Sequence, residues 1–349
     1  MMSNENKTIT IREVAADSEV SIATVSRVLN EPWRVKQPTR DRVSASIQKL
    51  GFKPNLRARL FAQGGSGTLC FLLSNRPFIH SVHAQILQGA ALEADVEGVQ
   101  VVYVPCHYSP DTPPSEIEMP QILAARGLID GVILAGTNYP NMLAAVKELG
   151  LPHVVFGTNL ITDDGPTDAC IVSVDDESGG YQATSHLISL GHTKIRFIGD
   201  VSLPWYKRRH AGYMRAMSEA GLTSYEPVGS AAKGELAMGY DAVNTLCDSG
   251  DEFTALFVGG DMGALGAIKA FTNRGLHVPD DVSIVGFNDE ELTAVVDPPL
   301  TTIRVPKEEV GAHCVRILNS IINKGAKCDQ PDVLPVCLVM RESTKSIGG

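Results

Sequence analysis

Short apolar runs alternate with amphipathic runs over most of this 349-residue chain. The amphipathic runs have helical spacing, as in residues 84–94, 179–191 and 262–275. The apolar runs have the length of buried strands and cover residues 68–73, 99–104, 131–135, 153–156, 171–174, 194–199, 255–259 and 282–287. Alternation of this kind predicts an α/β fold with parallel, doubly wound sheets. Nine or so strands after Thr68 predict two such subdomains.

The first fifty residues follow a different pattern, which predicts three short helices. Their apolar positions recur at helical spacing: Ile11, Val14 and Ala15, then Val25, Val28 and Leu29, then Val43, Ile47 and Leu50. Thr10 and Ser21 are suitable N-caps for the first two helices. Pro38 is expected in the first turn of the third helix, and Gly51 at its end. Two helices joined by a short turn and supported by a third form a helix-turn-helix head.

The second helix of such a head places its N-terminal residues against base edges in the major groove. The expected base-facing residues are Ile22, Ala23, Ser26 and Arg27. Arg27 can bind guanine through two hydrogen bonds, whereas Ile22 and Ala23 offer apolar contact to a thymine methyl group. Ser21 and Thr24 are placed for phosphate oxygens, and Thr10 and Asn30 are further expected DNA contacts. A three-helix bundle with a merely solvated face is the alternative, but exposed Ile22 and Ala23 do not suit it.

The net charge supports a nucleic-acid partner only when the first 62 residues are counted separately from the rest of the chain. The whole chain carries a formal net charge of −10. Residues 1–62 hold 11 Lys and Arg against 6 Asp and Glu, whereas the remaining residues hold 19 against 34. A basic head on an acidic body brings a polyanion to one end of the molecule, although ordinary surface variation can produce the same asymmetry.

Composition excludes several other classes. No apolar run approaches the roughly 20 residues of a membrane span, and the first ten residues contain no apolar leader. The seven cysteines are odd in number and never form a C-x-x-C pair. Buried free thiols in a reducing cytoplasm are therefore expected, without a disulfide framework, a metal site or a cofactor.

The head resembles the LacI/GalR (lactose-repressor) family of transcription regulators. The resemblance rests on "VSIATVSRVLN" (20–30) and "TRDRVSASIQKLGFKPN" (39–55). It implies that Ile22 and Ala23 form the base-reading pair and that Arg27 is the arginine of the motif. Glu19 stands where the family has Gly or Asn, which costs roughly 1 kcal/mol if the residue is left-handed. Lys36 replaces the serine that normally caps the third helix.

Residues 54–67, "PNLRARLFAQGGSG", combine a helix-capable run with a glycine-rich break. A flexible tether is one interpretation. The resemblance implies instead a hinge helix that inserts an apolar wedge into the minor groove, with Phe61 in place of the family's leucine. Asn55, Ala58 and Arg59 keep their positions in this motif. So short a helix does not persist alone in water, and we expect it to order when two copies pair on DNA.

The core segments resemble the family's effector-binding domain, itself similar to periplasmic sugar-binding proteins. We expect a head at 8–55, a hinge at 56–67 and a core at 68–349. Within the core, the N-subdomain is expected to comprise residues 68–168 and 303–325, and the C-subdomain residues 169–302 and 326–345. The chain should cross between the subdomains three times, with a helix at Lys307–Lys324 and a return through residues 334–340.

Ligands of parallel sheets bind outside the carboxyl ends of the strands. Polar residues follow most of the predicted strands, and about half of them are expected to be simple caps. The resemblance adds Arg209, three residues before Gly212, and marks Gly260 and Asn288 as departures that remove an amide and a carboxylate. Arg76 and Arg209 together suit an anionic group. The expected effector contacts are Asn75, Arg76, Phe78, His80, Thr158, Arg209, Asp261 and Asn288.

These features predict a transcriptional regulator, specifically a repressor, that binds a pseudo-palindromic operator as a homodimer. Its DNA affinity would respond to a small polar metabolite, expected to be a sugar or sugar derivative. A binding protein or enzyme on the same core is the alternative. The chain contains no G-x-S-x-G, H-E-x-x-H or Walker A motif, so catalysis is not expected.

Overall fold

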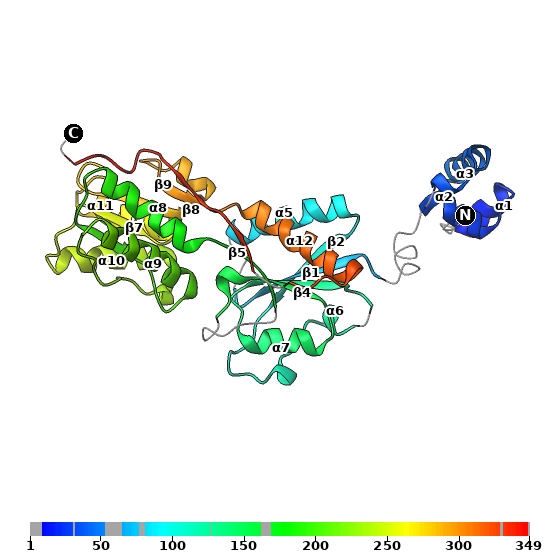
Figure 1. The fold of residues 1–349 in the computed structure, drawn as a ribbon, viewed down its shortest axis with the longest axis horizontal. Coiled ribbons are helices and arrows are strands. Elements are labelled where there is room, and N and C mark those ends of the chain that lie inside the picture. Colours follow the sequence, from blue (N-terminus) through cyan, green and yellow to red (C-terminus); the bar gives the residue numbers. More distant parts are fainter. Residues whose placement is uncertain are drawn as a thin grey trace, which may run out of the picture. The chain divides into compact units, whose positions relative to one another are not determined.

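A computed structural model of the protein describes residues 9–30, 32–52, 65–76, 81–125, 127–161, 169–328 and 331–347. The chain forms two compact units, Met1–Ser66 and Gly67–Gly349 (Figure 1). The predicted hinge helix and several predicted contact residues lie outside the described residues. These contact residues are Asn55, Ala58, Arg59, Phe61, Phe78 and His80, together with the side chain of Asn30.

The first unit contains the three predicted helices. They are α1 (Ile11–Asp17), α2 (Ile22–Asn30) and α3 (Gln37–Leu50), with a 3-10 turn at Pro32–Arg34 between the last two. Their shared core consists of Val14, Ala15, Val25, Val28 and Val43. The apolar spacing in the sequence therefore identified the buried face of every helix. An ion pair of 2.7 Å from the Lys49 ammonium to Asp17 also joins α3 to α1, and it lowers the pKa of Asp17.

The ends of these helices match the predicted signals, with one exception. The Ser21 hydroxyl accepts a hydrogen bond of 3.1 Å from the Thr24 N–H, and Gly51 ends α3 in the left-handed conformation. Glu19 is left-handed, with φ of 53°, as the departure from Gly or Asn implied. Helix α3 begins after Lys36 without a side-chain cap, because a lysine has no oxygen to accept from the first N–H groups.

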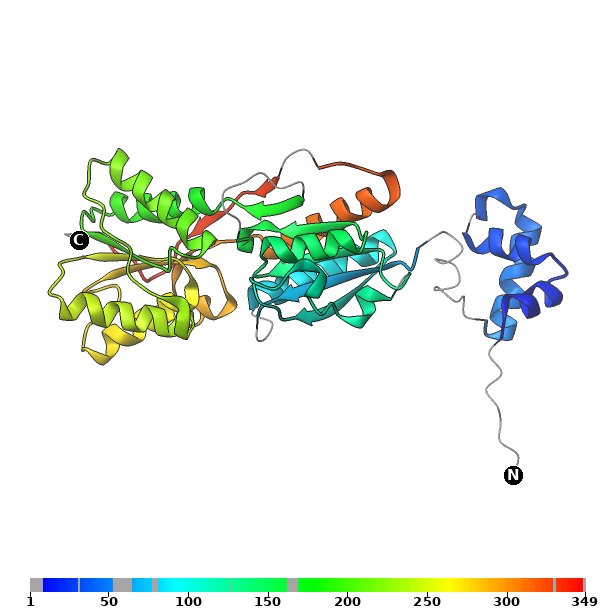
Figure 2. The same ribbon diagram turned by 90° about the horizontal axis from the view of Figure 1, so that it is seen from below.

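The second unit has two lobes, each built on one sheet between layers of helices (Figures 1 and 2). The N-lobe sheet has the order β10-β5-β4-β3-β1-β2, and its described strand pairs are parallel. Its strands are β1 (Thr68–Ser74), β2 (Gln100–Cys106), β3 (Gly131–Gly136), β4 (His153–Phe156), β5 (Cys170–Val174) and β10 (Asp332–Leu334). Strand β1 is apolar from Leu69 to Leu73 because its alternate residues enter two different cores, Leu69 and Phe71 on one face and Cys70 and Leu72 on the other.

The C-lobe sheet has the order β11-β9-β8-β7-β6. Its strands are β6 (Ile195–Ile198), β7 (Ala255–Val258), β8 (Ser283–Asn288), β9 (Thr301–Arg304) and β11 (Cys337–Val339). Strand β11 pairs with β9 in the antiparallel sense, and the other described pairs of this sheet are parallel. The predicted doubly wound α/β architecture is confirmed, with one antiparallel edge.

The expected boundaries between the subdomains need correction. Strand β5 belongs to the N-lobe sheet, so the first crossover follows Val174 and not residue 168. The return segment divides in the same way, because β10 pairs with β5 and only β11 reaches the C-lobe sheet. Strand β9 belongs to the C-lobe, so the second crossover lies at residues 304–307 and not at 303.

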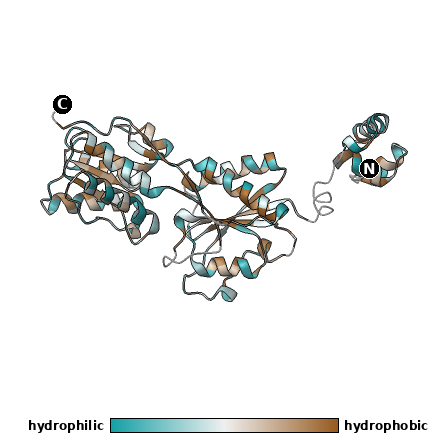
Figure 3. Ribbon diagram, viewed as in Figure 1, coloured by the Kyte–Doolittle hydropathy of each residue, from teal (hydrophilic) through white to brown (hydrophobic). Residues whose placement is uncertain are grey.

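Amphipathic helices cover both sheets, and hydrophilic and hydrophobic residues alternate along them (Figure 3). They are α5 (Ser81–Glu97), α6 (Gln121–Ala124), α7 (Pro140–Glu148), α8 (Asp176–Ser189), α9 (Pro204–Glu219), α10 (Glu235–Asp248), α11 (Asp261–Asn273) and α12 (Lys307–Lys324). Glycines bring α8 and α9 into backbone contact: a Cβ atom on Gly180 would lie 2.0 Å from the Arg209 carbonyl oxygen, and one on Gly212 would lie 2.0 Å from that of Glu177. None of the described helices is long and apolar enough to cross a membrane.

The expectation of free thiols throughout the chain was wrong for one pair. Cys170, at the start of β5, forms a disulfide with Cys328, which follows α12. Their Cα atoms are 5.2 Å apart, within the usual range for such a bond. The 158-residue separation gives no spacing motif, because the two cysteines meet only when α12 packs against the sheet that contains β5.

Candidate functional site

The exposed surface of α2 carries three of the predicted base-facing residues. Ile22, Ala23 and Arg27 are exposed, and the Ile22 side chain keeps 45% of its accessible surface. Ser21 and Thr24 lie at the start of the helix, where their hydroxyl oxygens are 2.9 Å apart. The Glu13 carboxylate accepts from the N–H and the hydroxyl of Thr10 at the start of α1. Exposure leaves these side chains accessible to a partner, as the predicted contacts with base edges require.

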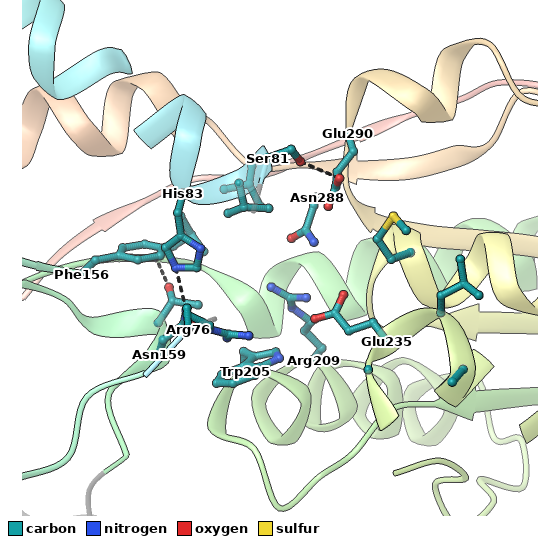
Figure 4. A pocket seen from close by; sticks show the side chains of 18 of the residues that line it. Arg76, Ser81, His83, Phe156, Asn159, Trp205, Arg209, Glu235, Asn288 and Glu290 are labelled. Carbon is teal, nitrogen blue, oxygen red and sulfur yellow. Dashed lines mark hydrogen bonds between the residues drawn. The ribbon is translucent and has the colours of Figure 1, made fainter. Parts of the chain in front are cut away.

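A cavity of about 510 Å³ lies between the two lobes of the core. The N-lobe contributes residues that follow β1 and β4 and the first turn of α5, whereas the C-lobe contributes the N-terminal parts of α9, α10 and α11 and the end of β8. The side chains that line the cavity include Arg76, Ser81, His83, Phe156, Thr158, Asn159, Trp205, Arg209, Glu235, Asn288 and Glu290 (Figure 4). Val174 and Val305, on two of the crossovers, also line it. The cavity therefore lies where movement of the lobes would change its shape.

Arg209 occupies the C-lobe wall, as predicted, and is held rigidly. Its Nε donates to Asp176 over 2.9 Å, its Nη1 donates to the Gly259 carbonyl, and its guanidinium lies 3.7 Å from the centre of the Phe287 ring. Asp176 is 1% exposed and also accepts two hydrogen bonds from Arg208. One buried carboxylate thus orients two adjacent arginines. Asp176 was not among the predicted contact residues, although it begins α8 directly after β5, near the carboxyl ends of the strands.

Arg76 also lines the cavity, but it is held differently. Its guanidinium carbon lies 5.4 Å from the Trp205 ring centre. The Arg76 side chain makes no hydrogen bond or ion pair with any residue in the described part of the chain, and its Nε is buried. Burial lowers the pKa of Arg76, and the nearby carboxylate of Glu235 opposes that effect. Trp205 and Glu235 were not predicted as contacts, because the prediction considered residues that directly follow a strand and these two lie in the first turn of a helix.

Glu235 lies beside the position that the resemblance marked as a departure. A Cβ atom on Gly260 would lie 3.3 Å from the Glu235 carboxylate and 3.4 Å from the Tyr206 hydroxyl. The carboxylate therefore stands next to the space that an asparagine side chain would use. The cavity retains a polar group here, supplied by a different element.

Two expected effector residues do not line the cavity. The Asn75 side chain accepts from the Tyr108 N–H over 3.0 Å, and its backbone is left-handed with φ of 51°, so it closes the turn after β1. Asp261 is fully buried behind the wall, where it accepts from the Thr302 hydroxyl over 2.6 Å and from the Glu290 N–H over 2.8 Å. Burial raises the pKa of Asp261 to about 7. Both residues shape the loops that carry the wall.

The remaining predicted contacts lie in the cavity wall, close to interactions that join the lobes. Asn288 faces the cavity from the end of β8, with φ of 120°. The Thr158 carbonyl accepts from Arg208 of the other lobe over 2.5 Å. Ser81 at the start of α5 donates to the Glu290 carboxylate over 2.6 Å (Figure 4). The cavity is thus closed on two sides by contacts between the lobes.

His83 lines the N-lobe wall and is 3% exposed. Its Nε2 lies 3.3 Å from the Asn159 amide nitrogen, and the two side chains form a hydrogen bond. No group of three His, Cys, Asp or Glu in the described ranges is placed to hold a metal ion.

The described parts define a class: a helix-turn-helix head on a two-lobed core with a cavity between the lobes. Residues 10–55 match the model of bacterial regulatory proteins of the lacI family, and residues 184–344 match that of a periplasmic binding protein-like domain. The chain is 33% identical over 341 residues to the HTH-type transcriptional regulator DegA of Bacillus subtilis (strain 168), covering 97% of this chain and 98% of that protein. The chain belongs to the lacI family of bacterial regulatory proteins, and it is a DNA-binding transcriptional regulator.

Other relatives match over nearly the whole length. Catabolite control protein A of Priestia megaterium is 30% identical, with 97% of this chain and 99% of that protein covered. The lac repressor dimer bound to operator and an anti-inducer has a TM-score of 0.78 at 27% identity, with 97% and 100% covered. The complex of the transcriptional regulator CelR with cellobiose has a TM-score of 0.69 at 28% identity, with 96% and 99% covered. DegA and CelR are named as transcriptional regulators, and the lac repressor as a repressor.

Proposed function

We propose that this protein is a repressor whose operator affinity is controlled by a sugar or sugar derivative bound between the lobes. The observation that carries the proposal is the joint presence of an exposed reading surface on α2 and a polar cavity lined by the interlobe crossovers. The similarity to a regulator in complex with cellobiose supports a carbohydrate-like ligand. The ligand contacts are Arg76, Thr158, Arg209 and Asn288, with Trp205 and Glu235 added from the structure.

The active form is a homodimer that binds a pseudo-palindromic operator. Large apolar side chains are exposed on one edge of the N-lobe: Leu92 and Val96 on α5 are 59% and 81% exposed, and Tyr103 on the edge strand β2 is 40% exposed. The C-lobe exposes Leu292 and Val295. Apolar surface of this kind suits a second copy of the chain. The similarity to the lac repressor dimer supports the same assembly, in which two heads multiply base and phosphate contacts.

The ligand acts through the arrangement of the lobes. Ser81 and Glu290 belong to different lobes, and so do Thr158 and Arg208, so a ligand between them would alter contacts that join the lobes. A ligand shifts such an equilibrium only as far as it binds one arrangement more tightly, which for allosteric proteins is typically about 1–3 kcal/mol.

The test is DNA binding by the purified full chain. Fluorescence anisotropy with an operator selected from random DNA should show affinity that falls steeply as salt rises, because phosphate contacts release counterions. Arg27→Ala should weaken operator binding by about 1–3 kcal/mol and relax the preference at one base pair in each half-site. Uniform weakening on all sequences would make Arg27 a phosphate contact, and absence of DNA binding at low salt would refute the proposal.

A further inference from the structure

One buried carboxylate connects the wall of the cavity to a contact between the lobes. Asp176 is 1% exposed, and its two oxygen atoms are divided between two adjacent arginines of α9. Its Oδ1 accepts from the Arg209 Nε over 2.9 Å, and its Oδ2 accepts from the Nε and Nη2 of Arg208 over 3.1 and 2.9 Å. Asp176 begins α8 directly after β5, so the carboxylate lies where the chain first passes from one lobe to the other.

The two arginines have different further partners. Arg209 lines the cavity (Figure 4), and its other hydrogen bond in the described part of the chain is to the Gly259 carbonyl, also in the C-lobe. Arg208 instead reaches the N-lobe, where its Nη2 donates to the Thr158 carbonyl over 2.5 Å. Asp176 therefore stands between a side chain of the cavity and a side chain that holds the opposite lobe.

The shared carboxylate makes the two arginines depend on each other. A carboxylate without contact to water is unfavourable unless cations and hydrogen-bond donors compensate it, and Asp176 has both arginines for this purpose. Members of one hydrogen-bond network commonly show effects that are not additive. The Arg208 side chain is 39% exposed, so its direction toward the N-lobe depends on Asp176 more than on burial.

We propose that Arg208 is a positioning residue that transmits the state of Arg209, a proposed ligand contact, to the N-lobe through Asp176. A ligand oxygen bound to the Arg209 guanidinium changes how firmly Asp176 is held, and Arg208 carries this change to the Thr158 carbonyl. The inference rests on the proposed function and adds a route by which a ligand acts on the lobe arrangement.

Hydrogen–deuterium exchange of the full chain, followed by mass spectrometry without ligand, tests the first step. Residues 153–161 of the N-lobe contain the acceptor Thr158. Arg208→Met should accelerate exchange there about fivefold, since a hydrogen bond from a half-exposed charged group is lost. Arg208→Lys keeps the charge and should give a smaller change. Arg215→Met is the matched control, because it removes an exposed ion pair with Glu177 between the same two helices.

Arg209→Met tests the link through the carboxylate. The described hydrogen bonds of Arg209 are made within the C-lobe, so its loss should reach residues 153–161 through Asp176 and Arg208. Exchange in this segment should therefore rise, by less than in Arg208→Met. The double variant should match Arg208→Met alone, because both substitutions interrupt the same route.

Each outcome decides the matter. Unchanged exchange of residues 153–161 in a folded Arg208→Met variant overturns the inference, and so does an equal rise in Arg215→Met. Unchanged exchange in Arg209→Met, or additive effects in the double variant, removes the link through Asp176. These measurements require no operator. A chain that binds no operator loses the proposed function, whereas the link between Arg209 and the N-lobe is decided by the exchange rates.

Discussion

Replacing Asp261 by asparagine is expected to change how the stability of the core depends on pH. Asp261 is fully buried, and burial raises its pKa from 3.8 to about 7, although the Thr302 hydroxyl and the Glu290 N–H lower it in part. Between about pH 4 and 7 the native carboxyl group keeps a proton that the unfolded chain has lost. The stabilisation from this group is therefore complete below pH 4 and is lost as the pH rises to 7.

The size of the effect follows from the shift. One pKa unit corresponds to about 1.4 kcal/mol, so the full shift amounts to about 4 kcal/mol, of which about 3 kcal/mol falls between pH 5 and pH 8. Asparagine does not titrate, so Asp261→Asn should be relatively more stable at pH 8 than at pH 5 by about that amount. Any constant cost of the altered hydrogen bonds displaces the whole curve and leaves its slope unchanged.

Urea unfolding at pH 5, 6, 7 and 8 measures this slope. The chain has two tryptophans, so a Trp33→Phe background leaves Trp205 as the fluorescent reporter of the core. Asp280→Asn is the matched control, because Asp280 is an exposed carboxylate of the same lobe. If the stability difference between wild type and Asp261→Asn is the same at pH 5 and pH 8, the reasoning about this buried carboxyl group is wrong.

Three further outcomes follow from the described geometry. Glu19→Gly should raise the stability of the head by up to about 1 kcal/mol in urea unfolding followed by circular dichroism, because glycine adopts the left-handed conformation without a Cβ penalty; a loss of stability would contradict this. Gly212→Ala should destabilise the core by about 1–3 kcal/mol, since the added Cβ meets the Glu177 carbonyl, whereas the exposed Ser218→Ala on the same helix should change stability by less than about 0.5 kcal/mol. Alkylation of the denatured, unreduced chain should label five of the seven cysteines, and seven labelled thiols would exclude the bond between Cys170 and Cys328.

The strands and helices were predicted well because the spacing of apolar residues along the sequence reflects which side chains are buried. Helix α12 has the predicted bounds, Lys307–Lys324, and the buried faces of α1 to α3 are those that the apolar spacing indicated. Assignment to a sheet is different, because it depends on pairing between distant segments. Strand β5 is as apolar as its neighbours, and nothing in its own residues shows that it pairs with β4 and β10 before the chain crosses.

The site was predicted in part for a similar reason. Polar residues after strands either face a ligand or close a turn, and the sequence does not separate Asn288, which faces the cavity, from Asn75, which closes a turn. Asp261 looked like a ligand contact but binds a neighbouring strand and loop. Trp205 and Glu235 start helices, and only the folded lobes bring these helix ends to the cavity.

The reciprocal glycine contacts between α8 and α9 determine the stiffness of the C-lobe. Gly180 and Gly212 bring the two helix backbones together at the level of Asp176 and Arg209, so neither helix can approach the other further. The contact between the two backbones, together with the bond from Arg209 to Asp176, ties α8 to α9 beside the cavity. We therefore expect the C-lobe to move as one body, so that a displacement at the cavity reaches the three crossover segments that join it to the N-lobe.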